Sequence, residues 1–352
     1  MDKKCSGCGA VIQDKDRNKE GFVRPDNYKN SKLCERCFRI RNYGEYTKIT
    51  KTNQDFIPIL DEVNKTKDLV LLVVDSFMIQ NDFNMMKRHL KDNPIILVLT
   101  KRDILPKSMN NKKLIDYIKK FNLDVIDSVI ISGKKNYNLD LLMDKIYKYK
   151  KSNNVYVIGY TNAGKSTMIN KIIYNYSKID NEVTTSILPS TTLSSVDIKV
   201  DDELTLIDTP GILDENSIVD VVDIMTLKRL TPKKEIKPIS IQVKVPQIII
   251  IDNLVRLDLS DNNIIIYMSD GLRLDRFYKD NDRLKELVKR KVRILKNQDL
   301  VINGLGFIKF MKDDTFVVYV PKGVDVYTRD ALIWGWKYPL LILHKNVYNY
   351  NC

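Results

Sequence analysis

Apolar runs and helical spacing alternate along the middle of the chain, starting at about residue 53. Runs rich in Val, Ile and Leu predict strands at 69–75, 95–100, 127–131, 155–159, 195–200 and 203–208. Between them, apolar residues at helical spacing predict helices at 114–118, 139–149 and 168–174. Strands that alternate with helices usually form a mostly parallel sheet covered on both faces, so we expect an α/β domain here.

The last third of the chain has a different pattern, in which short apolar or alternating runs are separated by Asp-Asn turns. These runs predict strands at 239–245, 248–251, 254–259, 264–268, 307–311 and 316–320, with a hairpin turn at 312–315. Residues 282–294 contain six basic side chains, and we expect them to form a basic helix. The pattern favours a mainly antiparallel sheet or partial barrel.

The composition is that of a soluble globular protein, with 352 residues, 43% hydrophobic and 29% charged. This length is enough for two or three domains. No apolar run reaches the roughly 18 residues that a membrane span needs, and the first five residues lack the apolar segment of a secretory signal. We therefore expect a cytoplasmic protein without a membrane partner.

The positive charge is concentrated at the two ends of the chain. Lys and Arg minus Asp and Glu gives 12 − 7 = +5 for residues 1–50, 25 − 24 = +1 for 51–232 and 21 − 14 = +7 for 233–352, which add to the net charge of +13. The division matches three expected domains, at 1–48, 49–232 and 233–352. The two basic ends indicate contact with a polyanion such as RNA, while an ordinary solvated surface is the alternative.

The polar N-terminal segment contains two Cys-x-x-Cys pairs, Cys5/Cys8 and Cys34/Cys37. Four thiolates at this spacing can surround one tetrahedral zinc ion, and neither histidine of the chain lies in this segment. The alternatives are two disulfides, which a reducing cytosol disfavours, or a redox-active pair, which normally opens a helix in a βαβ unit. We predict a structural zinc site that supplies most of the folding free energy of this short segment.

A phosphate-binding pattern lies between the predicted strand at 155–159 and the helix that follows it. It has two glycines four residues apart, followed by Lys and Ser, so that backbone N–H groups can turn toward one anion. Lys165 is expected to reach the β- and γ-phosphates, and the Ser166 hydroxyl to bind Mg²⁺. The predicted nucleotide-binding residues of this phosphate loop are Gly159, Tyr160, Thr161, Asn162, Ala163, Gly164, Lys165, Ser166 and Thr167.

Two further short motifs end earlier strands and indicate a guanine base. Thr100-Lys101-Arg102-Asp103 matches the pattern in which an Asp accepts hydrogen bonds from N1–H and the 2-amino group of guanine. Adenine would leave that carboxylate unpaired, which disfavours its binding by several kcal/mol. Ser132-Gly133-Lys134, at the end of the next strand, is similar to the motif whose backbone contacts the base. Thr100 replaces the commoner Asn, and we expect it to lose an amide that braces the loop and the purine.

Two segments after the phosphate loop have the features of nucleotide switches. A Thr- and Ser-rich stretch at 184–193 is the candidate switch I, with Thr191 and Thr192 as ligands and Thr192 completing the Mg²⁺ shell. Asp208-Thr209-Pro210-Gly211 is the candidate switch II, in which Asp208 would hold Mg²⁺ through water and the Gly211 N–H would sense the γ-phosphate.

The order of these motifs along the chain is unusual. Ordinary small GTPases begin with the phosphate loop, whereas here both base motifs precede it, so the domain is predicted to be circularly permuted. Switch II then leads through residues 219–230 toward the C-terminal domain. We expect that ordering or releasing switch II reorients that domain.

The motifs CxGCG, CxRC, TKRD, SGK, GYTNAGKST, PSTTL and DTPG, in this order, resemble the YqeH-type circularly permuted GTPases of ribosome assembly. The stretches 227–236, 304–306 and 320–326 also resemble that family, so the likeness spans nearly the whole chain. It implies a GTPase that assists maturation of the small ribosomal subunit and has a β-rich C-terminal domain that binds RNA or protein. The expected partner of this monomeric protein is the small subunit or its precursor rRNA.

Hydrolysis is expected to be slow without help. Ile212 occupies the position after Gly211 at which Ras-like proteins place a glutamine that orients the attacking water. Asn162 resembles the asparagine of potassium-activated relatives, so we predict that it helps to bind K⁺; the alternative is an asparagine that satisfies backbone groups at the helix start. The predicted catalytic residues are Lys165, Thr192, Asp208, Gly211 and Asn162.

Two other functions remain open from the sequence. The chain could be a nucleotide-gated RNA-binding module in which hydrolysis is incidental. It could also be an ATP-dependent kinase that shares the phosphate loop, which the base motif at 100–103 and the DTPG segment disfavour.

Overall fold

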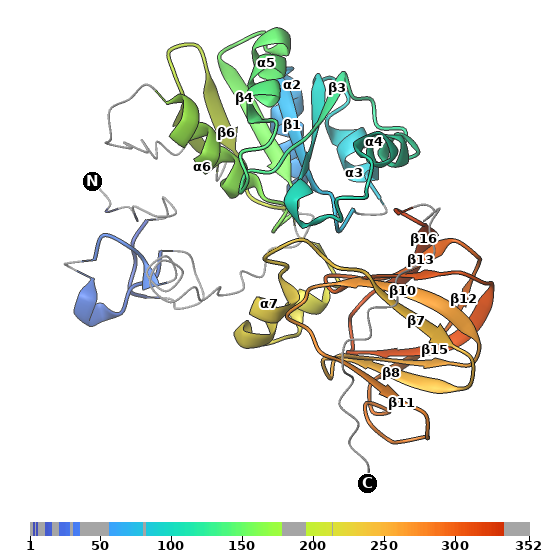
Figure 1. Ribbon diagram of the computed structural model, residues 1–352. Helices are drawn as coiled ribbons and strands as arrows, with labels where there is room; N and C mark the ends of the chain where they lie inside the picture. The colour runs from blue at the N-terminus through green and yellow to red at the C-terminus, as the bar shows by residue number, and fades with distance from the viewer. Residues whose placement is uncertain are drawn as a thin grey trace.

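The computed structural model describes residues 3, 5, 11–15, 21–28, 31–35, 56–79, 82–177, 195–212 and 214–333. An α/β domain and a domain of two stacked sheets lie against each other (Figure 1). Within the ranges described, no helix is both long and apolar enough to cross a membrane.

The α/β domain contains a six-stranded sheet in the order β3-β2-β1-β4-β6-β5. Its strands are β1 Leu69–Asp75, β2 Ile95–Thr100, β3 Asp127–Ile130, β4 Asn154–Gly159, β5 Val196–Lys199 and β6 Thr205–Asp208. All neighbours pair in parallel except β5, which pairs antiparallel with β6. The predicted strands and mostly parallel sheet are thus confirmed, and the strand before the phosphate loop lies near the middle of the sheet.

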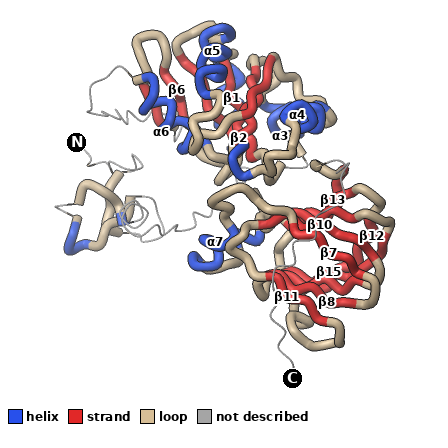
Figure 2. The backbone as a smooth tube through the Cα atoms, viewed as in Figure 1, coloured by secondary structure: helices blue, strands red, loops and turns tan. Residues whose placement is uncertain are grey.

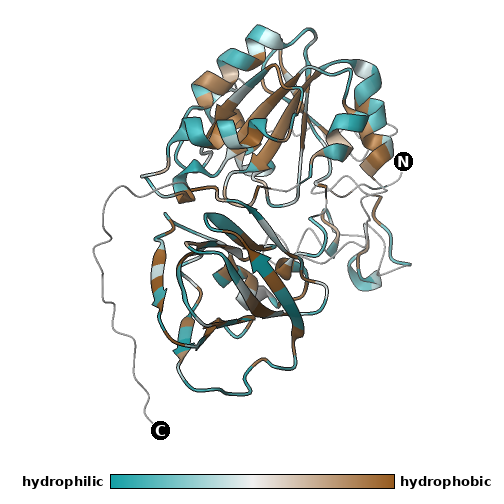
Figure 3. Ribbon diagram, turned by 90° about the vertical axis from the view of Figure 1, so that its right-hand side faces the viewer, coloured by the Kyte–Doolittle hydropathy of each residue, from teal (hydrophilic) through white to brown (hydrophobic). Residues whose placement is uncertain are grey.

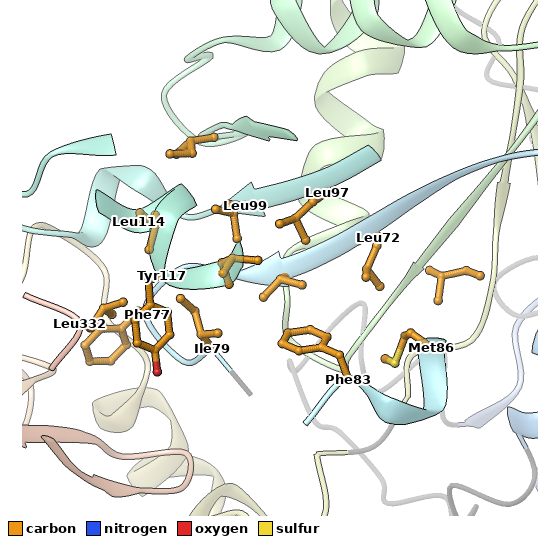
Figure 4. Packing of buried hydrophobic residues seen from close by; sticks show 14 of the residues in the cluster. Leu72, Phe77, Ile79, Phe83, Met86, Leu97, Leu99, Leu114, Tyr117 and Leu332 are labelled. Atoms are coloured by element: carbon orange, nitrogen blue, oxygen red, sulfur yellow. The ribbon is translucent and has the colours of Figure 1, made fainter. Parts of the chain in front are cut away.

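Helices cover both faces of this sheet, as the near-continuous apolar strands require. They are α2 Ile57–Thr66, α3 Asn84–His89, α4 Asn111–Lys119, α5 Leu139–Tyr149 and α6 Lys165–Tyr176. Successive residues of β1 point to opposite faces: Leu72 packs in one core with Met86 of α3, and Leu71 packs in the other with Ile146 of α5. Figure 4 shows part of the first core, and Figure 3 shows the apolar strands between the amphipathic helices.

The C-terminal domain is a β-sandwich, whose stacked strands are red in the lower part of Figure 2. It has two five-stranded sheets, in which every neighbouring pair of strands is antiparallel. One sheet has the order β16-β13-β14-β10-β7 and the other β11-β8-β9-β15-β12. The strands are β7 Ile239–Val243, β8 Gln247–Ile251, β9 Val255–Leu259, β10 Asn262–Met268, β11 Leu274–Phe277, β12 Val288–Ile294, β13 Gln298–Ile302, β14 Gly306–Phe310, β15 Asp314–Val320 and β16 Val326–Asp330. The expected mainly antiparallel architecture is therefore present.

Two details of the C-terminal prediction are wrong. Residues 288–294 form the edge strand β12 and no basic helix. Val288, Val292 and Ile294 lie at every second or fourth position, on the opposite face of the strand from Lys289, Lys291 and Arg293, which is the period of a strand. The segments around 307–311 and 316–320 do form strands, but β14 and β15 belong to different sheets. The turn between them therefore connects the two layers of the sandwich and is not a hairpin.

The two domains share a hydrophobic core. Phe77 and Ile79, which follow β1, cluster with Phe307 of β14 and with Leu332, and the rings of Phe77 and Phe307 lie 5.4 Å apart. Figure 4 shows Leu332 next to Phe77 and Tyr117. Apolar burial of this kind is the main stabilising contribution in a protein core, so the sandwich is held against the α/β domain by more than the chain connection.

The segment that follows switch II packs on the sandwich, whereas Ile212, directly after Gly211, packs in the core with the α/β strands. This segment contains a 3₁₀ turn, η4 Ile218–Asp220, and the helix α7 Ile224–Leu230, and both Ile218 and Leu230 are buried in the sandwich core. The predicted domain limits at 48 and 232 stay a prediction.

Candidate nucleotide-binding site

The phosphate loop connects β4 to α6 and has the backbone of an anion-binding turn. Asn162 and Gly164 both have positive φ, 61° and 97°, which turns the chain sharply before the helix begins at Lys165. Gly159 lies so close to β1 that a Cβ atom would be 2.3 Å from the Val73 carbonyl oxygen, so only glycine fits there. The N-terminus of α6 therefore presents its unpaired N–H groups to this loop.

Lys165 lies at the centre of the phosphate side. Its side chain is buried, and its Nζ donates a hydrogen bond to the Gly159 carbonyl oxygen at 3.0 Å. Burial lowers the pKa of Lys165, while the charge of Asp208 acts in the opposite direction. A Cβ atom on Gly211 would lie 3.1 Å from Nζ, so the switch II glycine and the loop lysine are close neighbours.

Asp208 is the last residue of β6 and lies at the same edge of the sheet as the phosphate loop, which follows the parallel strand β4. Burial raises its pKa to about 6, against the opposing effect of Lys165. Among the described residues, its Oδ1 atom is buried and has no hydrogen-bond partner. Because an unpaired buried carboxylate oxygen is costly unless a cation binds it, Asp208 fits the chemistry of a Mg²⁺ site.

Ile212 fixes switch II to the phosphate loop. Its N–H donates to the Gly159 carbonyl oxygen at 3.1 Å, and its carbonyl oxygen accepts from the Thr161 N–H at 2.7 Å. The side chain is 1% exposed and packs in the core. The Ile212 side chain therefore supplies no polar group to orient a water molecule, and slow hydrolysis stays a prediction.

The base motif at 100–103 contacts the SGK loop and the phosphate loop directly. The Ser132 hydroxyl donates to Asp103 Oδ1 at 2.6 Å, which orients the carboxylate. The Thr100 hydroxyl lies within hydrogen-bond distance of the Ala163 carbonyl oxygen, and 3.2 Å from that of Val74. The Thr100 hydroxyl therefore contacts the phosphate loop, and the expected loss of an amide that braces the loop and the purine stays a prediction.

Lys101 is held by an ion pair that the sequence did not indicate. Its Nζ lies 2.7 Å from Oδ2 of Asp75, the last residue of β1, and the other oxygen of Asp75 accepts from the Phe77 N–H at 2.8 Å. Lys101 itself has a left-handed backbone, with φ of 58°. These contacts fix the backbone turn that begins the 3₁₀ helix η3 Arg102–Ile104.

One pocket joins the two sides of the site. Asp103 and Gly133 line it together with Gly164 and Thr167, so the base motifs and the phosphate loop face the same cavity. The full lining is Thr100, Lys101, Asp103, Ile104, Gly133, Lys134, Gly164, Thr167, Met168 and Pro232. Sequence reasoning missed Pro232, because nothing in its local motif indicates that it returns to this pocket.

Several predicted site residues lie outside the described ranges. They include Thr191 and Thr192 of switch I, and Cys8 and Cys37 of the N-terminal segment. Cys5 and Cys34 are described and lie together, each 1% exposed, with the Cys34 N–H 3.1 Å from Cys5 Sγ. An N–H donor to sulfur is typical of metal-bound thiolates and orients them. Within the described part, no group of three potential ligands gathers around one point, so zinc stays a prediction.

Comparison with known proteins shows the family of proteins to which this chain belongs. It matches the family described as RsgA GTPase over residues 68–216, and the family described as 50S ribosome-binding GTPase over residues 154–303. YqeH of Bacillus subtilis is 35% identical over 361 aligned positions, which cover 94% of this chain and 99% of that protein. The chain belongs to the YqeH family. It is a circularly permuted GTPase of the ribosome-biogenesis type.

More distant relatives share parts of the chain. The chloroplast GTP-binding protein Brassinazole insensitive pale green 2 of Arabidopsis thaliana is 25% identical over 93% of this chain, which spans 62% of that relative. GTPase Der of Mycoplasma mycoides is 26% identical over 58% of this chain and 48% of its own length. A GDP-bound structure of YlqF is 21% identical, with coverage of 48% of this chain and 63% of that one and a TM-score of 0.29.

Proposed function

We propose that this GTPase is an assembly factor for the small ribosomal subunit, and that its nucleotide state reaches the sandwich through switch II. The observation that carries the nucleotide part is the single pocket lined by Asp103 and by the phosphate loop. The choice of the small subunit rests on the resemblance to the family and on the basic charge of both ends of the chain. A cytoplasmic location goes with this partner.

On the phosphate side, backbone N–H groups of residues 160–167 would surround the β-phosphate, and Lys165 would contact the β- and γ-phosphates. Ser166, Thr192 and Asp208 would bind Mg²⁺, which neutralises charge on the phosphates during hydrolysis. On the base side, Asp103 would pair with guanine, oriented by Ser132. Thr100 would keep the base loop at a fixed distance from the phosphate loop.

The coupling proposal rests on hydrogen bonds between the continuation of switch II, residues 214–218, and the sandwich. Asn303 Nδ2, at the turn after β13, donates to Asp214 Oδ1 at 3.1 Å and to the Glu215 carbonyl oxygen at 3.2 Å. The Asn303 carbonyl oxygen accepts from the Ile218 N–H at 2.9 Å. Any movement of switch II driven by the γ-phosphate would have to break or carry along these bonds.

The RNA-binding proposal is supported by one edge of the sandwich. Lys289, Lys291 and Arg293 alternate along β12, all exposed and on one face of the strand, and β12 is the edge of its sheet. Unpaired cations in a row can follow a phosphate backbone.

In the same proposal, the N-terminal segment is a zinc-binding domain. Elemental analysis should find about one zinc ion per chain, and the Cys34→Ser variant should lose it.

Potassium is the proposed aid to hydrolysis. Asn162 is exposed and has φ of 61°, which places it at the outer turn of the phosphate loop. A bound K⁺ there would supply positive charge for hydrolysis. The alkyl side chain of Ile212 supplies no such charge. We expect faster GTP hydrolysis in KCl than in NaCl of equal ionic strength, and equal rates would remove the proposal for Asn162.

The function is tested by binding to purified small and large ribosomal subunits and their precursors, with GTP, a non-hydrolysable analogue, GDP and ATP. We expect the GTP-bound form to prefer the small subunit. Since one matching family is described by the 50S subunit, preference for the large subunit is the result that would redirect the proposal. Single-turnover hydrolysis with and without subunits separates an enzyme from a module in which hydrolysis is incidental. Protection against thermal unfolding by ATP and not by GTP would favour the kinase.

A further inference from the structure

The segment between α7 and β7 runs along the face of the sandwich that meets the α/β domain (Figure 1). We call residues 232–236 the strap. They connect the helix α7, which follows switch II, with β7, the first strand of the sandwich. This connection does not by itself require the chain to return to the nucleotide site. The strap nevertheless lies on the base side of that site.

Three contacts hold the strap to the loops of the base motifs. The Ile236 N–H donates to the Ile104 carbonyl oxygen at 2.8 Å, directly after Asp103. Glu235 Oε1 accepts from the Lys107 N–H at 2.9 Å, and Lys134 Nζ of the SGK loop donates to the Lys233 carbonyl oxygen at 2.5 Å.

The strap is also anchored by burial at its end. The Ile236 side chain is 2% exposed and belongs to the core that the α/β domain shares with the sandwich. The segment is therefore fixed in place at the rim of the pocket, and Pro232, at its start, faces the cavity.

Pro232 adds an apolar wall to a pocket whose recognition groups are polar. It lines the cavity together with Asp103, Gly133 and Lys134, which are the residues on the side of the base. A planar purine has two apolar faces, and excluding water from a face strengthens the hydrogen bonds made at the base edge. A proline ring is rigid, so little conformational entropy is lost when it contacts the base.

We propose that the strap is the outer wall of the guanine pocket and that Pro232 is a positioning residue for the base. The proposal rests on the nucleotide site as assigned above. Because the wall lies on the base side, it raises the affinity for GDP and GTP by the same factor and does not select between them.

The test compares nucleotide affinity in full-length variants, with fluorescent GDP and a non-hydrolysable GTP analogue as probes. Glu235→Ala removes one contact that fastens the strap, and Pro232→Ala removes most of the ring that faces the cavity. Both should raise the Kd for GDP and for the GTP analogue about three- to tenfold, with the ratio of the two unchanged. Glu235→Gln keeps an acceptor oxygen and should stay close to the parent.

Lys234→Ala is the matched control within the strap. Lys234 pairs with Asp270 of the sandwich at 2.6 Å and is not among the described residues that line the pocket, so its loss should leave both Kd values unchanged. Unchanged affinity in both test variants would overturn the proposal, as would a change confined to the GTP analogue or an equal effect of Lys234→Ala. Thermal melting confirms that each variant is folded. Subunit binding by the parent protein tests the assembly function independently of these results.

Discussion

The sandwich meets the α/β domain through two contacts of opposite character. Near the base side the contact is apolar and buried, with Phe77 and Ile79 packed against Phe307 and Leu332. Near the phosphate side, hydrogen bonds join Asn303 and Asp325 to the continuation of switch II, beside Ile218, whose side chain is buried in the sandwich core. A buried apolar contact is lost only at a large cost, whereas one hydrogen bond typically contributes about 1 kcal/mol.

This difference indicates a division of labour. In the proposed coupling, the apolar contact would keep the sandwich attached in every nucleotide state, and the polar contact would be the part that a moving switch II rearranges. Gly304, next to Asn303, has φ of 80°, and a Cβ atom there would lie 2.1 Å from the Ser217 hydroxyl oxygen. The two surfaces are therefore close enough for movement on one side to displace the other.

The largest effect is expected from Phe307→Ala. The ring is 1% exposed, stacks on Tyr267 with centroids 4.7 Å apart, and contacts Phe77. Its loss should lower the free energy of unfolding by about 3 to 5 kcal/mol, because a cavity forms where the domains meet. Calorimetry should also show the single transition splitting into two. Phe307→Leu keeps most of the volume and should cost much less; equal effects of the two variants would contradict a packing role.

The next effect concerns a buried charge beside the apolar contact. Asp299 is fully buried near Arg329, whose guanidinium donates to the Ile79 carbonyl oxygen of the α/β domain at 3.2 Å. Burial raises the pKa of Asp299 to about 6, against the opposing charge of Arg329. Since the folded pKa lies above the ordinary value of 3.8, the folded protein holds this proton more tightly, and its contribution to stability grows as the pH falls through about 6.

Asp299→Asn removes this titration. The difference in unfolding free energy between the parent and the variant should change by about 2 kcal/mol between about pH 8 and about pH 4.5, with the parent gaining relative to the variant toward low pH. Chemical denaturation of both proteins across this range measures it. Parallel stability curves would contradict the raised pKa.

The strands and motifs of the nucleotide site can be predicted from the sequence, whereas contacts between distant segments cannot. The runs at 69–75 and 95–100 predict buried strands, and the phosphate loop is evident from its glycines and lysine, because each signal is local. The base motifs could be placed at strand ends for the same reason. The pairing of Asp75 with Lys101 and the return of Pro232 to the pocket depend on contacts between distant parts of the chain, and no local pattern indicates them.

The error at residues 282–294 has a different cause. Six basic residues in thirteen suggested a solvated helix, but charge does not set the period of a segment. Val292 and Ile294 stand two positions apart, as a strand with one buried face requires, and their pairing with β15 determines the outcome. The contact of the Thr100 hydroxyl with the Ala163 carbonyl oxygen is likewise not indicated by any local pattern, because the two residues are far apart in the sequence.

The smallest effect on stability, and the most specific one, is expected from Asn303→Ala. The change removes the two hydrogen bonds from Nδ2 to Asp214 and Glu215 and should cost about 1 to 2 kcal/mol. The affinity for GDP should be unaffected, because Asn303 does not line the nucleotide pocket. If switch II acts on the sandwich through these bonds, the ratio of ribosomal-subunit affinities in the GTP and GDP states should fall toward one. Asn262→Ala is the control inside the sandwich, where Asn262 Nδ2 donates to Lys312 and Asp314 and its Oδ1 accepts from the Met311 and Lys312 N–H groups, so the loss of stability should be at least as large. A ratio that falls equally in both variants would mean that general loosening of the sandwich, and not the contact with switch II, sets the response to nucleotide.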